Sequence, residues 1–452
     1  MMQKICIMGL GYIGLPTAIV AAEHGFEVVG FDIDIQRVER INNYDPVIQE
    51  PESIERLQPL IASGAFRATT ILEAADCFLI AVPTPFKEDK KADVSYVIAA
   101  TQAIAQVLKK DDVVIVESTV PVGLTDDCAR LLEEKTGLKA GEDFFVAHCP
   151  ERVLPGKIFF ELVNNPRIIG GVNPESVTRT KLFYKQFVKG QLYLTNATTA
   201  EMVKLVENSS RDVAIAFANQ VAAMAYATRL DPFEVIALAN KHPRVNILNP
   251  SCGVGGHCIA VDPWFLVETF PEQSQLLQTA RTVNDAKPLQ VVSLTRSWIQ
   301  EWQERNEGIP TVLVLGLTYK ADVDDMRESP ALAIAEKLQK YSDINLLVTE
   351  PNVAQTTLES LFNDAVVSLQ EGIDCADIII CLVPHKQFKD IDHSATRNKK
   401  ILDFCGLTYK PHVETSEQEA LFWPANSLQS MTPFEPYKAG SIHKTIFDKE
   451  FF

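Results

Sequence analysis

The run KICIMGLGYIG at residues 4–14 decides the fold. An apolar strand pattern leads directly into glycines with GxGxxG spacing, and a helical pattern follows. The next apolar run, EVVGFDID (27–34), carries an acid, Asp32, near its end. A strand, a glycine turn, a helix and an acid on the following strand are the parts of a dinucleotide-binding βαβ unit. The run therefore predicts an N-terminal Rossmann domain.

Each part of this unit has a physical role in holding a cofactor. The glycines allow a tight turn and let a pyrophosphate meet the helix N-terminus, while Asp32 accepts hydrogen bonds from ribose hydroxyls. A purely structural glycine turn is the alternative, and the surrounding strand, helix and acid favour the dinucleotide. Because Asp32 would repel a 2′-phosphate, we expect NAD rather than NADP, although nearby Arg37 weakens that preference. The motif residues of the expected site are Gly9, Gly11, Tyr12, Ile13 and Gly14.

The rest of the chain predicts the architecture. Its first part alternates short apolar runs with helical patterns, which is typical of parallel βαβ units with helices on both faces of a sheet. A second rhythm of this kind begins near residue 310. The expected fold class is α/β, with two Rossmann-like doubly wound parallel-sheet domains joined by a long central helix. The expected strands are KICIMG, EVVGFDID, CFLIAVPTP, DVVIVESTV and FFVAHCPE, then TVLVLGL, INLLVTEP, DIIICLVPH and KKILDFCG.

The middle of the chain differs from both flanks. An Ala-rich segment from about residue 198 to 241 has apolar residues at helical spacing, and Asp231 followed by Pro232 predicts that a helix restarts there. These patterns divide the chain into four expected parts. They are a dinucleotide-binding Rossmann domain at 1–197, a helical connector at 198–305, a second Rossmann-like domain at 306–437 and a tail at 438–452.

Composition excludes several classes of partner. The chain has 452 residues and a formal net charge of −17, which argues against nucleic acid or an anionic membrane surface as the main partner. No apolar run approaches the roughly 20 residues that span a bilayer, and the N-terminus lacks a signal-peptide pattern. The nine cysteines are scattered without a CxxC pair. We therefore expect a cytoplasmic protein with reduced thiols.

The run NPSCGVGGHCIAVDP (249–263) is the second unusual stretch. Its glycines allow close approach of backbone to a ligand, so Cys258 can be presented to a substrate near the carboxylate of Asp262. A lone cysteine is more often a buried apolar residue, and Cys252 is a rival thiol. His257 adjoins Cys258, but neighbouring side chains usually diverge. Zinc on these three residues stays open by residue type, yet the spacing fits no usual pattern, and we expect no metal.

Two further groups of polar residues have competing interpretations. Lys204 and Asn208 are four residues apart and share one face of the expected long helix, where a solvated surface pair is the plain alternative. The run GLTYKADVDDMRESPA (316–331) follows a strand and carries Lys320, Asp325 and Arg327. Its basic residues suit phosphates, whereas a charged turn with a helix cap explains them equally well.

Taken together, these runs resemble the UDP-sugar 6-dehydrogenase family, which includes UDP-glucose dehydrogenase. The match covers nearly the whole chain, and the joint occurrence of its motifs is highly specific. It implies an N-terminal NAD-binding domain, a long central helix that carries a homodimer contact, and a C-terminal domain that binds the UDP-sugar substrate. The matching motifs, in family order, are GLGYIG, VPTP, ESTVPVG, CPER, EMVKLVENSSRD, NPSCGVGGHC and GLTYKADVDDMRESP.

The resemblance implies a twofold oxidation of C6 from alcohol to carboxylate with two NAD. Cys258 would attack the aldehyde to give a thiohemiacetal, and a thioester would then be hydrolysed. Lys204 would assist the oxyanion, and Asp262 with a bound water would act as base. Further implied catalytic residues are Asn208, Thr119 and Glu151. Implied cofactor contacts are Asp32, Arg37, Thr84, Glu117 and Thr119, and implied substrate contacts are Glu151, Arg152, Lys204, Asn208, Gly255, His257, Lys320, Arg327 and, from a neighbouring subunit, Arg244.

One departure from the family pattern concerns the sugar. The glucose enzymes usually carry a lysine immediately before the aspartate that follows the cysteine, and Val261 stands there in this chain. The form CGVGGHCIAVDPWF resembles the branch that acts on UDP-N-acetylmannosamine. An N-acetyl group is bulkier at C2, so loss of a long cationic side chain is sterically reasonable. The alternatives are the same chemistry on UDP-N-acetylglucosamine or UDP-glucose, a two-electron alcohol dehydrogenase, and a non-catalytic nucleotide-sugar-binding module.

Overall fold

A computed structural model gives the structure of the chain and describes residues 2–45, 50, 52–87, 90–154, 156–256, 258–389, 391, 396 and 399–409. His257, the expected tail at 438–452 and the end of the second expected domain at residue 437 lie outside the described residues. The four domain boundaries therefore stay predictions.

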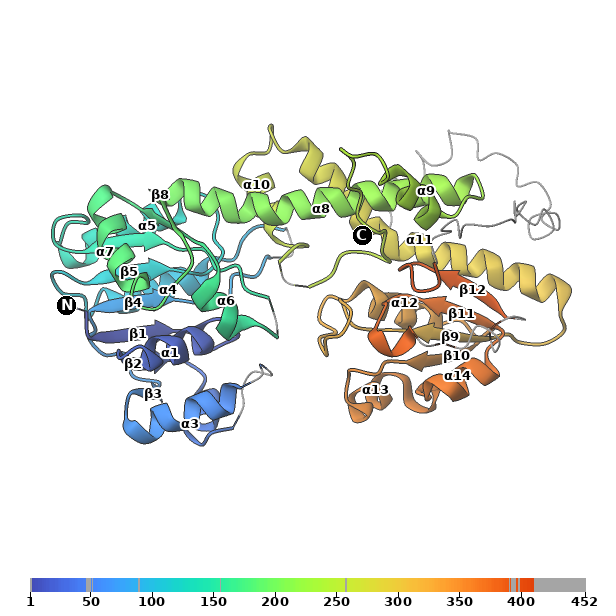
Figure 1. Ribbon diagram of the computed structural model, residues 1–452, viewed down its shortest axis with the longest axis horizontal. Helices are drawn as coiled ribbons and strands as arrows, with labels where there is room; N and C mark the ends of the chain where they lie inside the picture. Colours follow the sequence, from blue (N-terminus) through green and yellow to red (C-terminus); the bar gives the residue numbers. More distant parts are fainter. Residues whose placement is uncertain are drawn as a thin grey trace, which may run out of the picture. The chain divides into compact units, whose positions relative to one another are not determined.

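The first sheet of the described chain has eight strands in the order β3-β2-β1-β4-β5-β6-β7-β8 (Figure 1). All neighbouring strands run parallel except β6 and β7, which are antiparallel. The five strands expected from the N-terminal rhythm are present as β1, β2, β4, β5 and β6. The bounds are β1 Lys4–Met8, β2 Glu27–Phe31, β3 Phe66–Thr69, β4 Cys77–Ile80, β5 Val113–Val116, β6 Phe145–His148, β7 Arg167–Gly171 and β8 Leu192–Asn196.

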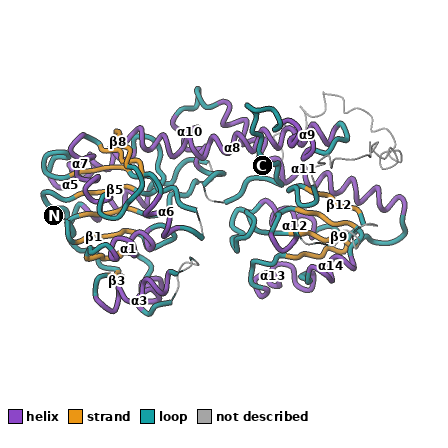
Figure 2. Tube along the Cα trace, viewed as in Figure 1, coloured by secondary structure: helices purple, strands orange, loops and turns teal. Residues whose placement is uncertain are grey.

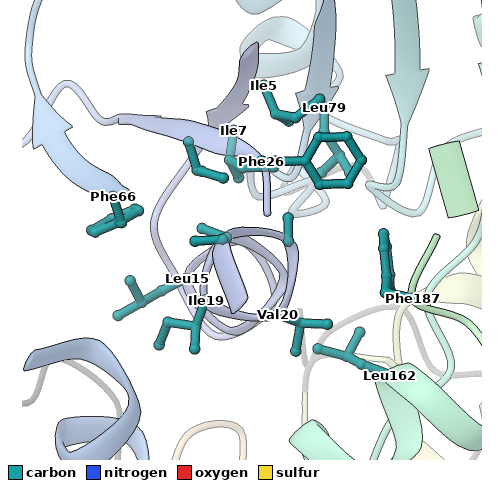
Figure 3. Close-up of a cluster of buried hydrophobic side chains, with 14 of the residues drawn as sticks. Ile5, Ile7, Leu15, Ile19, Val20, Phe26, Phe66, Leu79, Leu162 and Phe187 are labelled. Atoms are coloured by element: carbon teal, nitrogen blue, oxygen red, sulfur yellow. The ribbon is translucent and has the colours of Figure 1, made fainter. Parts of the chain in front are cut away.

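Strand β1 is buried on both faces, which explains why its sequence is continuously apolar. Successive side chains of a strand point to opposite faces, so Ile5 and Ile7 join one core cluster while Cys6 and Met8 join another. Figure 3 shows Ile5 and Ile7 against the side chains of helix α1. The helices of this region are α1 Gly14–Glu23, α2 Ile35–Asn42, α3 Ser53–Ser63, α4 Ser95–Ile104, α5 Leu124–Thr136, α6 Ile158–Asn164 and α7 Pro174–Tyr184.

Two 31-residue helices, α8 (Ala197–Ala227) and α11 (Gln275–Arg305), follow the first sheet. Figure 2 shows them as long purple segments that lie side by side. Helix α8 is the expected central helix. It ends at Ala227, and α9 (Pro232–Ala239) restarts with the Asp231 side chain capping its N-terminus, as the sequence predicts. Helix α10 (Asp262–Thr269) lies between α9 and α11 in the chain.

The second sheet has the order β10-β9-β11-β12, and all its described pairs are parallel. These four strands coincide with the four runs expected in the C-terminal rhythm, so the predicted fold class is confirmed. None of the helices in the described chain is both long and apolar enough to cross a bilayer. The bounds are β9 Thr311–Leu315, β10 Asn345–Thr349, β11 Ile378–Cys381 and β12 Lys400–Asp403, with α12 Pro330–Gln339, α13 Gln355–Phe362, α14 Leu369–Cys375 and short 3₁₀ turns at Asn363–Ala365 and Lys386–Phe388.

Candidate active site

The glycine loop after β1 has the geometry that a bound dinucleotide needs. Gly9 has φ +93°, a backbone conformation that residues with a Cβ rarely adopt. A Cβ on Gly14 would lie 1.8 Å from the carbonyl oxygen of Gly9, so only glycine lets helix α1 start this close to the turn. A Cβ on Gly11, by contrast, would meet no atom of the described residues within 4 Å. The loop is thus tightly closed on the protein side and open at Gly11, where a pyrophosphate would approach the N-terminus of α1.

Asp32, just after β2, lies beside this loop. It is 5% exposed, and its Oδ2 accepts the Leu10 N–H at 2.8 Å. The Arg37 guanidinium is 3.0 Å from the same oxygen, so this arginine is already paired with an acid. Because that pairing offsets the charge that would attract a 2′-phosphate, the geometry suits ribose hydroxyls better than a phosphate.

The thiol of Cys258 lies in a turn that places it close to Asp262. The Asp262 N–H donates to the Cys258 carbonyl at 2.9 Å, and Asp262 is the first residue of α10. Asn208, on α8, donates from Nδ2 to Asp262 Oδ2 at 2.5 Å. Lys204 lies one helical turn earlier on α8, and its charge acts on both the thiol and the carboxylate. The structure thus brings together four residues from two distant parts of the sequence.

Electrostatics in this group favour a neutral thiol beside a titratable acid. Burial raises the pKa of Asp262 to about 6, although the hydrogen bond from Asn208 and the charge of Lys204 oppose the rise. Desolvation by the surrounding protein and the negative charge of Asp262 raise the pKa of the Cys258 thiol, and Lys204 again opposes them. Cys258 is nevertheless exposed, whereas the rival thiol, Cys252, is buried in the apolar core. Of the two thiols, Cys258 is the one that a substrate can reach.

A buried ionic cluster lies at the carboxyl ends of β5 and β6. Arg167 Nη1 is 3.1 Å from Glu117 Oε1, and Arg167 Nη2 is 2.7 Å from Glu151 Oε2. The Tyr184 hydroxyl donates to Glu117 Oε1 at 2.6 Å, and the guanidinium stacks 4.8 Å from the centre of the tyrosine ring. Cys149 Sγ is 3.7 Å from Arg167 Nη1. One arginine therefore links two of the expected site carboxylates.

Glu117 has an unusual pKa for a carboxyl group. Burial raises its pKa to about 7, with Arg167 opposing the rise and Glu151 adding to it. Its Oε2 is buried and has no hydrogen-bond partner among the residues that the structure describes. Neither Arg167 nor Tyr184 was predicted from the sequence. The one available signal was a charge at the start of the apolar run RIIGG (167–171), and that run was not among the expected strands.

The remaining expected residues are more dispersed. Arg152 pairs with Glu207 at 2.9 Å and lines an open cavity of about 560 Å³, bordered also by Tyr193 and Thr199, rather than joining the group around Cys258. Arg327 pairs with Asp325 at 2.7 Å. Thr84 and Thr119 are partly exposed, and Arg244 and Lys320 are exposed. Gly255, next to the undescribed His257, packs so closely that a Cβ would lie 2.4 Å from the Glu328 carbonyl.

The described chain contains no group of three or more His, Cys, Asp or Glu residues arranged to hold a metal.

The loop at 316–328 touches the loop that carries Cys258, because a Cβ on Gly256 would lie 2.9 Å from the ring of Tyr319. The polar loop after β9 and the thiol loop therefore form one continuous surface.

Comparison with known proteins agrees with this geometry. Residues 3–188 match the NAD binding domain of the UDP-glucose/GDP-mannose dehydrogenase family, residues 198–286 its central domain and residues 313–410 its UDP binding domain. A Campylobacter jejuni UDP-N-acetyl-D-mannosamine dehydrogenase is 45% identical over 413 residues, which cover 89% of this chain and 99% of that protein. An NDP-N-acetyl-D-galactosaminuronic acid dehydrogenase of Ralstonia solanacearum is 43% identical, over 90% of this chain and 96% of its own.

Solved structures give the same result. The structure of a UDP-D-ManNAc dehydrogenase from Pyrococcus horikoshii superposes with a TM-score of 0.81 at 40% identity, covering 91% of this chain and 97% of that one. A dinucleotide loop in one sheet, a thiol group beside a long helix and a second nucleotide-binding sheet define an NAD-dependent dehydrogenase that acts on a UDP-sugar. The chain belongs to the UDP-glucose/GDP-mannose dehydrogenase family.

Proposed function

We propose that this chain is a UDP-N-acetyl-D-mannosamine 6-dehydrogenase, which oxidises C6 of the sugar through four electrons to UDP-N-acetyl-D-mannosaminuronate. The observation that carries the proposal is the exposed Cys258 thiol held beside Asp262, Asn208 and Lys204. A dehydrogenase that stops at an aldehyde has no use for a nucleophile at this position. NAD, bound at the glycine loop, accepts one hydride in each of the two oxidations.

In the first oxidation Asp262 acts as the base. It takes the proton of the C6 hydroxyl through a water molecule as the hydride leaves, which gives an aldehyde. The Cys258 sulfur then bonds to the aldehyde carbon, and the thiol proton passes to the oxygen, so that a thiohemiacetal forms. Lys204 stabilises the negative charge on that oxygen, and Asn208 keeps the Asp262 carboxylate oriented by their 2.5 Å hydrogen bond.

In the second oxidation the thiohemiacetal loses a hydride and its hydroxyl proton and becomes a thioester. Glu151 orients the water that attacks the thioester carbon, and the Cys258 sulfur leaves with a proton as the carboxylate forms. The 2.7 Å contact with Arg167 fixes Glu151 for this role. The covalent bond to Cys258 keeps the sugar in place while reduced cofactor is exchanged for NAD.

The identity of the sugar rests on relatives and on Val261. Proteins named as UDP-N-acetyl-D-mannosamine dehydrogenases are 42–45% identical to this chain. Val261 is buried against Leu205 and Phe265 and leaves no cation where the glucose enzymes are expected to carry a lysine. The Ralstonia solanacearum relative is named for an N-acetyl-D-galactosaminuronic acid, which differs from the mannosamine product at C2 and C4. The test must therefore distinguish sugars by their configuration at these two carbons.

The test is the number of NADH molecules formed per sugar. UDP-N-acetylmannosamine, UDP-N-acetylglucosamine, UDP-N-acetylgalactosamine and UDP-glucose are supplied in limiting amount, with Cys258→Ala as a parallel variant and Cys252→Ala as its matched control. We expect two NADH per UDP-N-acetylmannosamine, little turnover of the others, no uronic acid from Cys258→Ala and normal turnover in Cys252→Ala. Two NADH from another sugar would identify that sugar as the substrate instead. A normal rate of acid formation in Cys258→Ala would refute the covalent mechanism.

We also propose a cytoplasmic homodimer joined through helix α8. Val206, Phe217 and Met224 are 48%, 54% and 55% exposed and recur after 11 and 7 residues, so they form one apolar stripe. Lys204, Asn208 and the residues that face α11 lie on the opposite side of the helix. All nine cysteines are free, which supports a reducing compartment.

A further inference from the structure

The two sheets repeat the same turn after their first strand. Gly9 has φ +93° and donates its N–H to the Phe31 carbonyl at 2.8 Å. Gly316 has φ +88° and donates its N–H to the Thr349 carbonyl at 3.0 Å. Both glycines follow the central strand of a Rossmann pattern, β1 or β9, and contact the strand beside it. The second half therefore contains the dinucleotide-type turn, although it lacks the GxGxxG sequence.

The acid at the end of the neighbouring strand is repeated too. Leu10 donates its N–H to Asp32 Oδ2 at 2.8 Å, and Leu317 donates its N–H to Glu350 Oε2 at 2.7 Å. Glu350 follows β10 as Asp32 follows β2. By backbone geometry alone, each half presents a carboxylate where a ribose would bind.

The halves differ at a third equivalent position. The sequence Val-Pro-Thr follows β4 and ends at Thr84, whereas Val-Pro-His follows β11 and ends at His385. Thr84 is partly exposed, but His385 is completely buried. The His385 ring lies against Glu350, the acid of the second half.

The contacts of His385 define its protonation. Nε2 lies 3.0 Å from Glu350 Oε2 and donates to it. Nδ1 accepts the Asp322 backbone N–H at 2.9 Å and Asn352 Nδ2 at 2.7 Å. The Asn352 amide is oriented by Gln387, whose Nε2 donates to its Oδ1 at 3.1 Å. Because a backbone N–H can only donate, Nδ1 is the accepting nitrogen of the ring and Nε2 is the donating one.

Glu350 is already engaged by four donors of the protein. Besides His385 it accepts the N–H groups of Leu317, Thr318 and, through Oε1, Asn352. Burial alone would raise its pKa, but the hydrogen bonds from His385 and the backbone lower it. The acid is therefore an ionised internal anchor, not a ligand for ribose hydroxyls.

The same histidine holds the loop that leaves this turn. Asp322 has φ +61°, a strained conformation for a residue with a Cβ, and its Oδ1 accepts the Lys386 N–H at 2.9 Å. Thr318 Oγ1 donates to the Lys320 carbonyl at 2.8 Å. Both ends of segment 318–322 are thus fixed, with the exposed Lys320 between them.

We propose that His385 is a positioning residue that holds segment 318–322 in the shape that binds the UDP of the substrate. This inference rests on the proposed role of Lys320 in UDP-sugar binding. It identifies a difference between two halves that share the same turn and acid: Asp32 is paired with the partly exposed Arg37, whereas Glu350 is covered by the buried ring of His385.

Two substitutions in the full-length chain separate the roles of the ring nitrogens. In His385→Asn the side-chain oxygen replaces Nδ1 and keeps the bond to Asp322. In His385→Gln the amide nitrogen replaces Nε2 and keeps the bond to Glu350. Binding of UDP alone is measured by calorimetry without NAD, and KM is measured for NAD and for the UDP-sugar. We expect His385→Gln to raise the Kd for UDP about tenfold, His385→Asn to stay within about threefold, and KM for NAD to be unchanged in both.

A second pair keeps the test decisive if the buried substitutions impair folding. Asp322→Ala removes the bond to Lys386 at an exposed position, whereas Asp322→Asn keeps an acceptor there and tolerates the left-handed backbone. We expect only the alanine variant to weaken UDP binding. Unchanged UDP binding in both His385→Gln and Asp322→Ala, or a parallel loss of NAD affinity, would overturn the inference. Because UDP binding needs no turnover, a wild-type chain that binds UDP without oxidising UDP-N-acetylmannosamine would refute the proposed sugar and leave this inference standing.

Discussion

Asp262 is the residue whose ionisation should set the acid limb of the reaction. Its pKa of about 6 means that the base is lost as the pH falls through 6. We expect kcat to decline below pH 6 in the wild-type protein, and Asp262→Asn to lower kcat about 10²–10⁴-fold and abolish that limb. The measurement is a pH profile of NADH formation. Glu272→Gln, an exposed substitution just beyond α10, is the matched control, and an unshifted acid limb in Asp262→Asn would assign the ionisation to another group.

The raised pKa of Glu117 predicts how the stability of the protein depends on pH. Its pKa of about 7 lies above that of an unfolded glutamate, so the native state keeps a proton that the unfolded chain has lost. This contribution is complete at low pH and disappears as the pH rises through 7. The other titratable groups of the cluster are the same in the wild type and in a Glu117 variant, so a comparison of the two isolates Glu117. These groups are Arg167, Glu151, Tyr184 and Cys149.

We therefore expect Glu117→Gln, which stays neutral, to remove part of the decline in stability between pH 5 and 7.5. Each unit of pKa difference is worth about 1.4 kcal/mol, so the effect should be a few kcal/mol at most. Urea midpoints of the two proteins across this range measure it. Parallel curves for wild type and variant would show that Glu117 is ionised throughout.

At the scale of elements, helices α8 and α11 are joined by a buried polar network. Arg281 Nη1 lies 2.6 Å from Asp212 Oδ1, and Asn284 Nδ2 donates to the same oxygen at 2.8 Å. Asn284 Oδ1 accepts Asn219 Nδ2 at 3.0 Å, and Asn219 Oδ1 accepts the Ser251 N–H at the start of the thiol loop. The network thus connects the helix pair with the loop that carries the nucleophile.

Removing the arginine leaves Asp212 buried without its cation. We expect Arg281→Ala to lower the free energy of unfolding by about 3–5 kcal/mol. Arg296→Ala on the same helix breaks a partly exposed pair with Asp343 and should cost about 0–1 kcal/mol. Urea denaturation followed by circular dichroism compares the two, and equal losses would contradict a role for burial.

The elements were predictable from the sequence where one residue pattern was sufficient. Nine continuous apolar runs gave nine of the observed strands, because strands buried on both faces need no alternation. Strand β8 was missed because it is largely exposed, and α11 because several of its buried residues, such as Arg281 and Asn284, are polar. Polar burial is invisible to a search for apolar periodicity.

The site was predictable only in part for the same reason. The motifs identified Cys258, Asp262, Lys204 and Asn208 as candidates, but their proximity depends on α8 passing the thiol loop. Arg167 was missed because its partners, Glu117 and Glu151, come from other strands. The repeat between the halves also went unnoticed, since it consists mainly of backbone turns, with only Gly-Leu-x-Tyr and a Val-Pro dipeptide in common.

At the scale of the whole molecule, the prediction concerns assembly. If the apolar stripe of α8 joins two copies, Phe217→Glu buries a charge in the interface and should convert a particle of twice 50.2 kDa into one of 50.2 kDa. Light scattering coupled to gel filtration measures the mass. Leu182→Glu, at an equally exposed position on α7, should leave the mass unchanged, and a wild-type mass of 50.2 kDa would refute the dimer.

Helix α8 fixes both the distance and the relative rotation between the parts of the protein that contact its two halves. Asn208, in the first half of the helix, touches Asp262, and the Tyr226 hydroxyl near its end donates to the Asp403 carbonyl of the second sheet. One inserted residue would turn everything beyond it by about 100° and advance it by only about 1.5 Å. A seven-residue insertion would nearly restore the rotation while lengthening the span by about 10 Å. The fold therefore couples the thiol group to the second sheet by angular register, and evolution of this helix should tolerate substitutions far more readily than insertions or deletions.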